Sequence, residues 1–405
     1  MPNSPANQYA YEKPSAPVNV STAPIERFAL VCVPSVLLLR DIAPSLTLLF
    51  AVIAAGIVGA ATFGKSLAYR GSMLWLMFIA VGAFSFAMTL IYRPVPMQSL
   101  AALALMYALI AGMSIALARR RKEYIIAIAA DMTLVAAVTS MALWAMGVQP
   151  AVVWAEGVGN SSMMQMLGFN ILRQVFPLMG GSTAQAAIFG LAALVCLYRK
   201  GWAYKAVFGL MVLGLFLADG RAALLALVLA LIPFGRKWLV LLIPLGIPAL
   251  LALFAFLPSS FLGRFARSGQ ATEITSGNNR VEIWEAGYRY LIENPYTLSF
   301  GNGFYGQSVF MGGFQRTFQN FTADSHSMHN MGLQLWIDQG IAGVLVVTAM
   351  AYAVLSRLSG IGAAMMAYIL IVGLFDTFGT IYWDVGFFVF ALLAWSVLKR
   401  KSGEI

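Results

Sequence analysis

The sequence predicts an all-α polytopic membrane protein. Hydrophobic residues make up 60% of the 405-residue chain, charged residues make up only 10%, and the mean hydropathy is +0.80. A water-soluble domain needs more charged surface than this, whereas a chain that crosses a bilayer repeatedly has this composition. Apolar runs close to the length of a membrane-spanning helix, about 20 residues, recur along most of the sequence. The two cysteines, Cys32 and Cys196, lie in such runs and are expected to be small buried side chains, without a disulfide or metal site.

The apolar runs define about 12 candidate transmembrane helices. They cover residues 27–39, 42–62, 72–92, 97–118, 124–147, 179–198, 203–218, 222–235, 238–257, 331–355, 360–379 and 384–398. Residues 1–26 are polar and rich in proline, serine and asparagine, without the pattern of a signal peptide, and are expected to form a disordered cytoplasmic tail. The predicted order is this tail, helices 1–9 over 27–257, a loop domain over 258–330, helices 10–12 over 331–398, and a short tail over 399–405.

The distribution of basic residues predicts the orientation in the membrane. Most of the 26 lysines and arginines fall in alternate connecting segments, including Arg119–Lys122 and Lys399–Lys401. Because such residues are retained on the cytoplasmic side, both termini are expected in the cytoplasm and the loop 258–330 on the outer side. The net charge of +10 is then a consequence of topology and does not indicate a nucleic-acid partner.

The outer loop is too long to lack secondary structure, and its best helix candidate is Asn279–Asn294. Apolar side chains recur there at helical spacing, at Val281, Trp284, Tyr288 and Leu291. Asn279 could cap the helix, which would place Arg280 beside the unpaired N–H groups of the first turn and create an anion site. The alternative is an ordinary interfacial helix with a solvated arginine.

A second stretch, Asp324–Gly343, contains both histidines of the protein, His326 and His329, where the polar loop returns to apolar sequence. If a helix begins at His329, then Trp336, Gly340 and Gly343 lie on one stripe with the imidazole, within roughly 60°. The glycines would let a neighbouring helix or a lipid chain approach the backbone closely. The alternative is a plain membrane helix with a histidine at its end.

Two further arginines on the predicted outer side are candidate anion ligands. Arg221 lies in a short turn between two apolar runs, and Arg173 lies in the preceding outer segment. A guanidinium group presents a permanently charged fork that suits phosphate oxygens. The alternative is an arginine that extends to the lipid head groups.

These residues carry a family resemblance. His329 and Asn330, followed by nine residues and then Gly340-Ile341-Ala342-Gly343, resemble the signature of O-antigen ligases. Four further segments resemble the wider ligase and polymerase superfamily: Gly220-Arg221, Arg280 with Trp284, Asn294-Pro295 and Gly301-Asn302-Gly303-Phe304.

The resemblance implies a GT-C-type glycosyltransferase of the bacterial inner membrane. Such an enzyme transfers O-antigen polysaccharide from undecaprenyl diphosphate to a sugar hydroxyl of the lipid A core on the periplasmic side. Arg221 and Arg280, with Arg173 as a weaker third, would bind the diphosphate, and His329 would act as the general base or hydrogen-bond the acceptor. His326 would orient a substrate or be an ordinary loop residue. Supporting roles fall to Asn330, Trp284, Trp336, Gly340 and Gly343, with the tryptophans stacking on sugars or belonging to an interfacial belt.

No cofactor is expected, and the reaction is expected to invert the anomeric configuration without a metal. Asp324, His326 and His329 could supply three zinc ligands, but no HExxH motif or cysteine pair accompanies them. An O-antigen polymerase or a protein O-oligosaccharyltransferase would use the same donor. A 12-helix secondary transporter remains a different class, which Asp131, Asp338 and Asp376 favour as ionisable groups within apolar segments.

Overall fold

The computed structural model describes residues 69–92, 97–148, 160–177, 182–232, 235–256, 280–309, 327–379 and 385–401. Its helices are α4 (Met73–Tyr92), α5 (Met97–Ala116), α6 (Lys122–Ala145), α7 (Ser162–Met166), α8 (Ser182–Tyr198), α9 (Trp202–Leu217), α10 (Arg221–Ala230), the 3-10 helix η2 (Arg236–Leu241), α11 (Leu242–Phe256), α14 (Arg280–Glu293), α15 (Pro295–Phe300), α17 (Met331–Arg357), α18 (Gly360–Val372) and α19 (Val385–Leu398). The apolar segments 27–39 and 42–62 lie outside the described residues.

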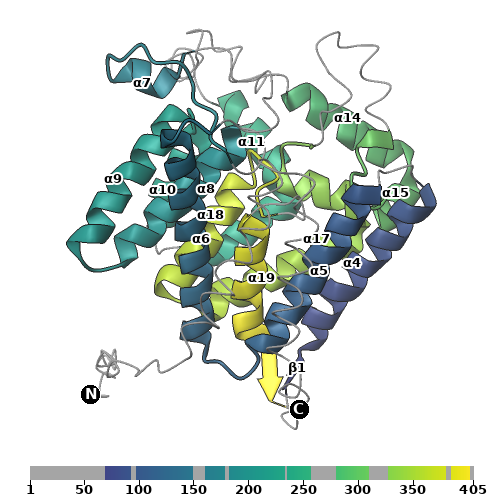
Figure 1. The fold of residues 1–405 in the computed structure, drawn as a ribbon. Helices are drawn as coiled ribbons and strands as arrows, with labels where there is room; N and C mark the ends of the chain where they lie inside the picture. Colours follow the sequence, from purple (N-terminus) through teal and green to yellow (C-terminus); the bar gives the residue numbers. More distant parts are fainter. Residues whose placement is uncertain are drawn as a thin grey trace, which may run out of the picture.

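The described part of the chain is mostly helical, as the composition predicts. Within it α4, α6 and α17 are long and apolar enough to cross a membrane by length and composition, and α8, α9, α10, α18 and α19 are shorter apolar helices. Residues throughout α18 and α19 are buried, so these two helices form the centre of the bundle (Figure 1). The Tyr368 hydroxyl on α18 donates to the Ala187 carbonyl of α8 at 2.8 Å, and Gly190 on α8 leaves room for that phenol.

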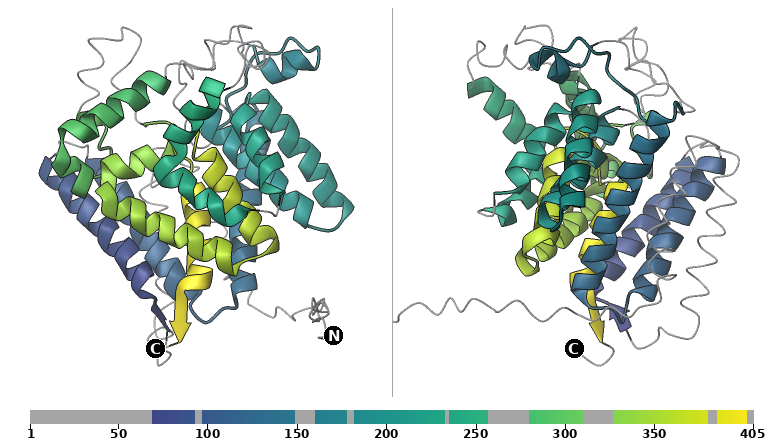
Figure 2. Two further views of the ribbon diagram at one scale, coloured as in Figure 1. Left: turned by 180° about the vertical axis from the view of Figure 1, so that it is seen from behind. Right: turned by 60° about the vertical axis from the view of Figure 1, so that its left-hand side comes forward.

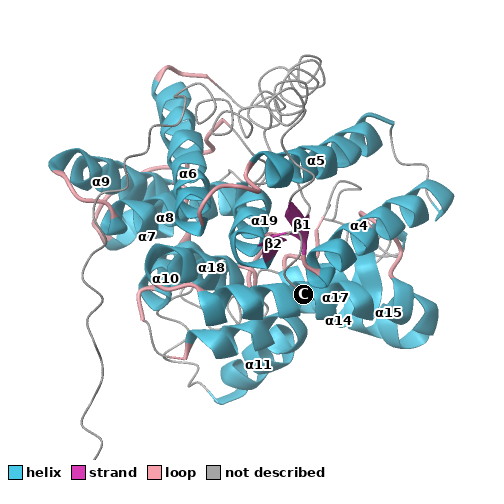
Figure 3. Ribbon diagram, turned by 90° about the horizontal axis from the view of Figure 1, so that it is seen from below, coloured by secondary structure: helices cyan, strands magenta, loops and turns pink. Residues whose placement is uncertain are grey.

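The two ends of the bundle differ. Helices α7 and α14 lie at one end, and a short antiparallel ladder of β1 (Tyr69–Gly71) and β2 (Lys399–Lys401) lies at the other (Figures 1 and 2). Seen from below, the ladder lies between α4 and α19 (Figure 3). An all-α prediction did not include this ladder, which forms because the chain entering α4 runs antiparallel to the chain leaving α19. Main-chain pairing continues from the Ser72 N–H to the Leu398 carbonyl at 2.9 Å.

Helix α17 does not carry the uninterrupted stripe expected from helical spacing. His329 precedes the helix in a left-handed conformation with φ of 47°, and Asn330 is the N-cap residue. At Gly340 the backbone leaves the helical region, with φ of 63° and ψ of −165°. The stripe was therefore a wrong prediction, because the 100° helical period applies neither before Asn330 nor across Gly340.

A glycine-rich loop packs against α17 at this interruption. We call residues Gly301–Gly306 the glycine loop; it follows α15 and packs against α17 just before Gly340. The Asn302 N–H donates to the Ile337 carbonyl at 2.7 Å, and the Gly303 N–H donates to the Asp338 carbonyl at 3.0 Å. A helix that stops leaves its last carbonyls without donors, and the glycine loop supplies two of them.

The same loop is held against α4. The Phe304 N–H donates to the Thr89 hydroxyl at 2.7 Å, and the Ser85 hydroxyl donates to the Asp338 carbonyl at 3.2 Å. A Cβ atom at Gly303 would lie 2.5 Å from the Thr89 nitrogen, so this position admits glycine alone. The segment that approaches Gly340 is likewise the chain's own Ser299–Phe300, which occupies the space where a lipid chain was expected as an alternative.

Replacing Gly340 with alanine is expected to destabilise the protein. A Cβ atom there would lie 2.4 Å from the Ser299 carbonyl oxygen, in a left-handed conformation. The backbone strain alone is worth about 1–3 kcal/mol, before the collision is counted. Thermal unfolding of the detergent-solubilised protein, followed by size-exclusion chromatography, measures the loss. Gly209→Ala is the control, because a Cβ at this helical position in α9 meets no atom within 4 Å; equal melting temperatures for the two variants would contradict this account.

Candidate functional site

The candidate site is built around the first residues of α17 and the turn that follows α18. The Asn330 side chain caps α17 by accepting from the Leu333 N–H at 2.9 Å. Its amide nitrogen donates to the Leu374 carbonyl at 3.0 Å, and the Met331 N–H donates to the Gly373 carbonyl at 2.7 Å. We call Gly373–Thr377 the α18 turn. Asparagine suits this position because one side chain caps its own helix and donates to the neighbouring turn.

Arg280 reaches the same turn from α14. It is the first residue of that helix, as the sequence predicts, and its guanidinium donates to the Phe375 carbonyl. The Asn279 cap lies outside the described residues. The apolar face of α14, with Ile283, Trp284 and Leu291 buried, packs against Leu333 and Ile337 of α17. Burial also raises the pKa of the nearby Tyr288 phenol to about 12, so this side chain stays neutral. The packing of α14 therefore fixes the position of Arg280 at the start of that helix.

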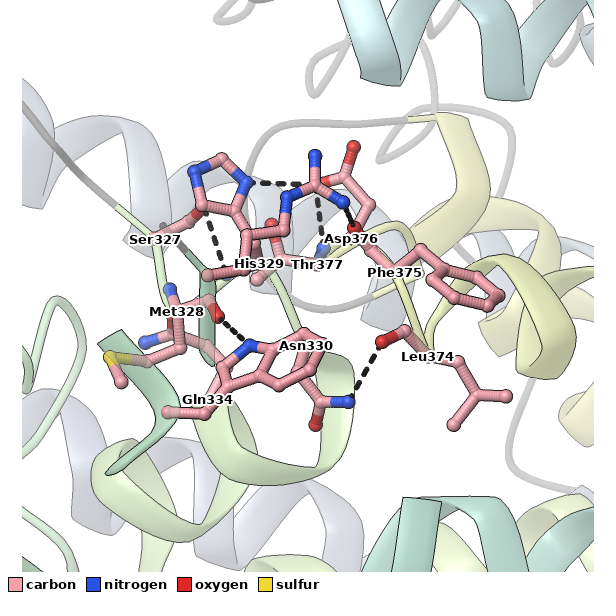
Figure 4. A network of polar contacts seen from close by, with 11 residues as sticks. Ser327, Met328, His329, Asn330, Gln334, Leu374, Phe375, Asp376 and Thr377 are labelled. Carbon is pink, nitrogen blue, oxygen red and sulfur yellow. Dashed lines mark hydrogen bonds and ion pairs between the residues drawn. The ribbon is translucent and has the colours of Figure 1, made fainter. Parts of the chain in front are cut away.

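His329 lies beside an acidic residue of the α18 turn. Its Nδ1 atom is 4.0 Å from Oδ1 of Asp376, and both side chains are largely buried. The Asp376 carboxylate also accepts from the Thr377 N–H at 2.7 Å. Figure 4 shows the imidazole directed toward Asp376, with Phe375 and Leu374 following the same turn. A carboxylate on one side of an imidazole favours the tautomer that leaves the other ring nitrogen able to accept a proton.

Trp284 supports the loop before His329. Its indole N–H donates to the Met328 carbonyl at 2.9 Å, and its side chain is only 2% exposed. Phe304 is similarly buried. The expected stacking of Trp284 on a sugar is therefore not available in this structure, because packing between α14 and α17 covers the ring. Trp336 is partly exposed, and its indole N–H donates to the Leu298 carbonyl at 3.2 Å.

Arg221 and Arg173 meet at a separate turn, Ala218–Arg221. Arg221 begins α10, and its N–H donates to the Asp219 carbonyl at 3.2 Å. The Arg173 guanidinium donates to the Ala218 carbonyl at 3.0 Å. The buried Asp219 carboxylate, at a residue with φ of 58°, accepts from the Ser162 hydroxyl at 2.7 Å and thereby ties α7 to this turn. Gly220 packs on Ala186, next to the residue that accepts from Tyr368, so this turn and the α18 turn belong to the same end of the bundle.

A region that spans most of these residues matches a known family. Residues 206–348 match the family model described as O-Antigen ligase. This part of the chain is therefore similar to O-antigen ligases. A search of curated proteins gave no match. The matched region begins within α9 and ends within α17, so it includes Arg221, Arg280 and His329. Arg173 and Asp376 lie outside it. The match confirms the resemblance carried by the His329–Gly343 motif and supports activity of the O-antigen ligase or polymerase type.

The structure divides the residues expected in the site into groups. Arg280, His329, Asn330 and Trp284 lie around the α18 turn, whereas Arg221 and Arg173 lie around the Ala218–Arg221 turn. Gly340 and Gly343 belong to the interruption of α17, where the Gln339 side chain covers Gly343. His326 lies outside the described residues. Asp376 was not among the predicted site residues, although an aspartate within an apolar run was a signal that could have indicated it.

The three acidic residues that favoured a transporter each have a defined structural environment. Asp131 forms an ion pair with Arg199 at 3.0 Å. Asp338 accepts from the Gly306 N–H at 2.8 Å, and Asp376 faces His329. Among the described residues, no group of three or more His, Cys, Asp or Glu side chains could hold a metal ion. Asp324 and His326, two of the considered zinc ligands, are not in that part of the chain.

Substitution of Asn330 tests the docking of α17 on the α18 turn. Asn330→Ala removes both the cap and the donor to Leu374, and it is expected to lower the free energy of unfolding by about 0.5–2 kcal/mol for the cap alone. Asn330→Ser keeps a hydroxyl that can cap the helix and is expected to lose less. Thermal unfolding of purified protein gives the order of the two variants. An alanine variant as stable as the wild type would show that the cap does not hold the head of α17.

Proposed function

We propose that this protein is an O-antigen ligase that transfers polysaccharide from undecaprenyl diphosphate to a sugar hydroxyl of the lipid A core. The observation that carries the proposal is the α18 turn, where Arg280 bonds to Phe375 and the next residue, Asp376, lies against His329. An anion ligand and a proton acceptor are thus held by adjacent residues of one turn. This pairing suits a reaction that separates a diphosphate from a sugar and deprotonates a hydroxyl.

The topology assigned in the proposal follows the distribution of basic residues. The chain has about 12 transmembrane helices in the bacterial inner membrane, a GT-C-like arrangement, and both termini in the cytoplasm. A periplasmic loop domain over 258–330 lies between helices 9 and 10. The α18 turn and the Ala218–Arg221 turn then face the periplasm. A lipid-linked donor suits this compartment, because the sugar is already activated by its diphosphate.

The chemical step is a displacement at the anomeric carbon. The acceptor oxygen forms a bond to that carbon, the bond from the carbon to the diphosphate oxygen breaks, and the configuration inverts. His329 accepts the proton of the acceptor hydroxyl, with Asp376 on the Nδ1 side holding the ring orientation. The negative charge that develops on undecaprenyl diphosphate is stabilised by the guanidinium groups of Arg280 and Arg221, with Arg173 beside the latter. The residues named in this step require no metal.

Transfer assays on purified components test these roles. His329→Ala is expected to lower kcat by about 10²–10⁴-fold, the usual contribution of a general base. Arg280→Ala and Arg221→Ala are each expected to lower kcat by about 10²–10³-fold, as for other groups that stabilise a developing anion. The measurement is transfer from lipid-linked polysaccharide to rough lipopolysaccharide. Arg289→Ala is the matched control, because this exposed arginine lies on α14 and pairs with Glu285 of the same helix, at 2.7 Å.

The products of the same assay separate the ligase from its relatives. A ligase places polymer on the lipid A core, a polymerase lengthens the lipid-linked glycan, and a protein O-oligosaccharyltransferase yields glycoprotein. Lengthened lipid-linked glycan with no labelled lipopolysaccharide would replace the ligase proposal with a polymerase. Full activity in the His329, Arg280 and Arg221 variants together would refute the proposed site.

Chelation tests the charge stabilisation by arginine. Transfer is expected to continue at the same rate in excess EDTA, because guanidinium groups supply the positive charge that a metal would otherwise provide. The rate is measured on protein dialysed against chelator and compared with untreated protein. Loss of activity that zinc restores would assign the step to a metal.

A further inference from the structure

A chain of buried hydrogen bonds connects the interruption of α17 to the loop that holds His329. The Met328 N–H donates to Oε1 of Gln334 at 2.9 Å. The Gln334 amide nitrogen donates to Oδ1 of Asp338 at 3.0 Å. The Gly306 N–H donates to the same carboxylate oxygen at 2.8 Å. From this connection we propose that Gln334 and Asp338 are positioning residues that set the place of His329 through the main chain of Met328.

The two side chains lie one helical turn apart on the first half of α17, where residues four apart stack along one face. Gln334 is fully buried and Asp338 is 3% exposed. Gln334 also donates to Oε1 of Gln307 at 2.8 Å, so its amide group is fixed from both the helix and the segment after α15. Figure 4 shows Gln334 beneath Met328, on the side of the loop away from Asp376.

The main chain on both sides of His329 is held by side chains. Before it, the Met328 N–H bonds to Gln334 and the Met328 carbonyl accepts from Trp284. After it, Asn330 caps α17 and bonds to Leu374. His329 has the left-handed conformation that non-glycine residues rarely adopt, and such a conformation persists only where the surroundings enforce it. Gln334 therefore makes one of the hydrogen bonds that hold the strained backbone of His329.

Stability of the interruption in α17 does not by itself require the hydrogen bonds of Gln334 and Asp338. The carbonyls at the interruption already receive main-chain donors from the glycine loop, and replacing a buried polar pair by apolar groups of similar shape can be nearly neutral for stability. Buried polar side chains within membrane helices are costly and tend to serve function. The chain of hydrogen bonds runs from the interruption to the residue before His329, which indicates that this function is positioning.

The experiment compares Gln334→Met with Thr348→Val. Methionine matches glutamine in length but cannot make the bond to Met328. Thr348 lies beyond Gly340 on the same helix, and its hydroxyl donates to the Val344 carbonyl of that helix at 2.6 Å. Hydrogen exchange followed by mass spectrometry is expected to show faster exchange of the segment containing the Met328 amide in Gln334→Met alone. In the transfer assay, kcat per folded molecule is expected to fall by about 10–100-fold, with KM for the lipid-linked donor unchanged, because a small misplacement of a reacting group is costly.

Asp338 provides the second pair of variants. Asp338→Asn keeps an oxygen that can accept from Gly306 and Gln334, and is expected to retain most of kcat. Asp338→Leu removes that oxygen and is expected to reproduce the loss seen for Gln334→Met. A role limited to stability would lower the yield and melting temperature of both Gln334→Met and Asp338→Leu while leaving kcat per folded molecule unchanged. That result would overturn the proposal, as would unchanged exchange at Met328.

The kinetic arm rests on the proposed function, whereas the exchange arm does not. If the wild type transfers no polysaccharide but Gln334→Met still releases the Met328 amide, the proposed function fails and the positioning of His329 stands. If the wild type is active and Gln334→Met exchanges faster with full kcat, the proposed function stands and the positioning role is refuted.

Discussion

The interruption of α17 at Gly340 is the constraint on which the rest of the structure depends. The backbone leaves the helical region there, and an unsatisfied main-chain group costs several kcal/mol in a membrane. The glycine loop supplies N–H groups to the carbonyls of Ile337 and Asp338, and it can come this close because its glycines lack side chains. The superfamily-like Gly301-Asn302-Gly303 segment therefore packs against the residues just before Gly340, and Gly340 itself packs against Ser299–Phe300.

Hydrogen bonds to main-chain carbonyls also hold the other end of the first half of α17, which begins at Met331. Three successive carbonyls of the α18 turn accept from Met331, Asn330 and Arg280, so the main chain of this turn orients three residues of the candidate site. The first half of α17 is thus fixed at both ends by main-chain hydrogen bonds to other segments. A short, fixed half-helix is a suitable support for a histidine, because errors in its position are transmitted directly to the imidazole.

The sequence predicted the features that depend on local rules and missed those that depend on distant contacts. The helix that begins near Arg280 followed from apolar spacing, and the start of α17 near Asn330 followed from the return to apolar sequence. The stripe through Gly340 was wrong because a glycine can leave the helical region, and spacing alone does not show when another segment makes it do so. Asp376 was missed as a site residue because its relation to His329 spans 47 positions and arises only when α18 packs against α17. The β1–β2 ladder was missed for the same reason. A Lys-Arg-Lys sequence has no local strand pattern and was interpreted as a cytoplasmic charge cluster.

The boundaries of the family match show why the site needs more than the matched region. Residues 206–348 include Arg280, Trp284 and His329 but end before α18. The carbonyls that orient Asn330 and Arg280, and the carboxylate beside His329, come from Gly373–Asp376. Without α18 the cap residue Asn330 would lose its second partner, and the imidazole would lose its acidic neighbour. The matched region therefore carries the residues that resemble the family, and the helices after it give those residues their geometry.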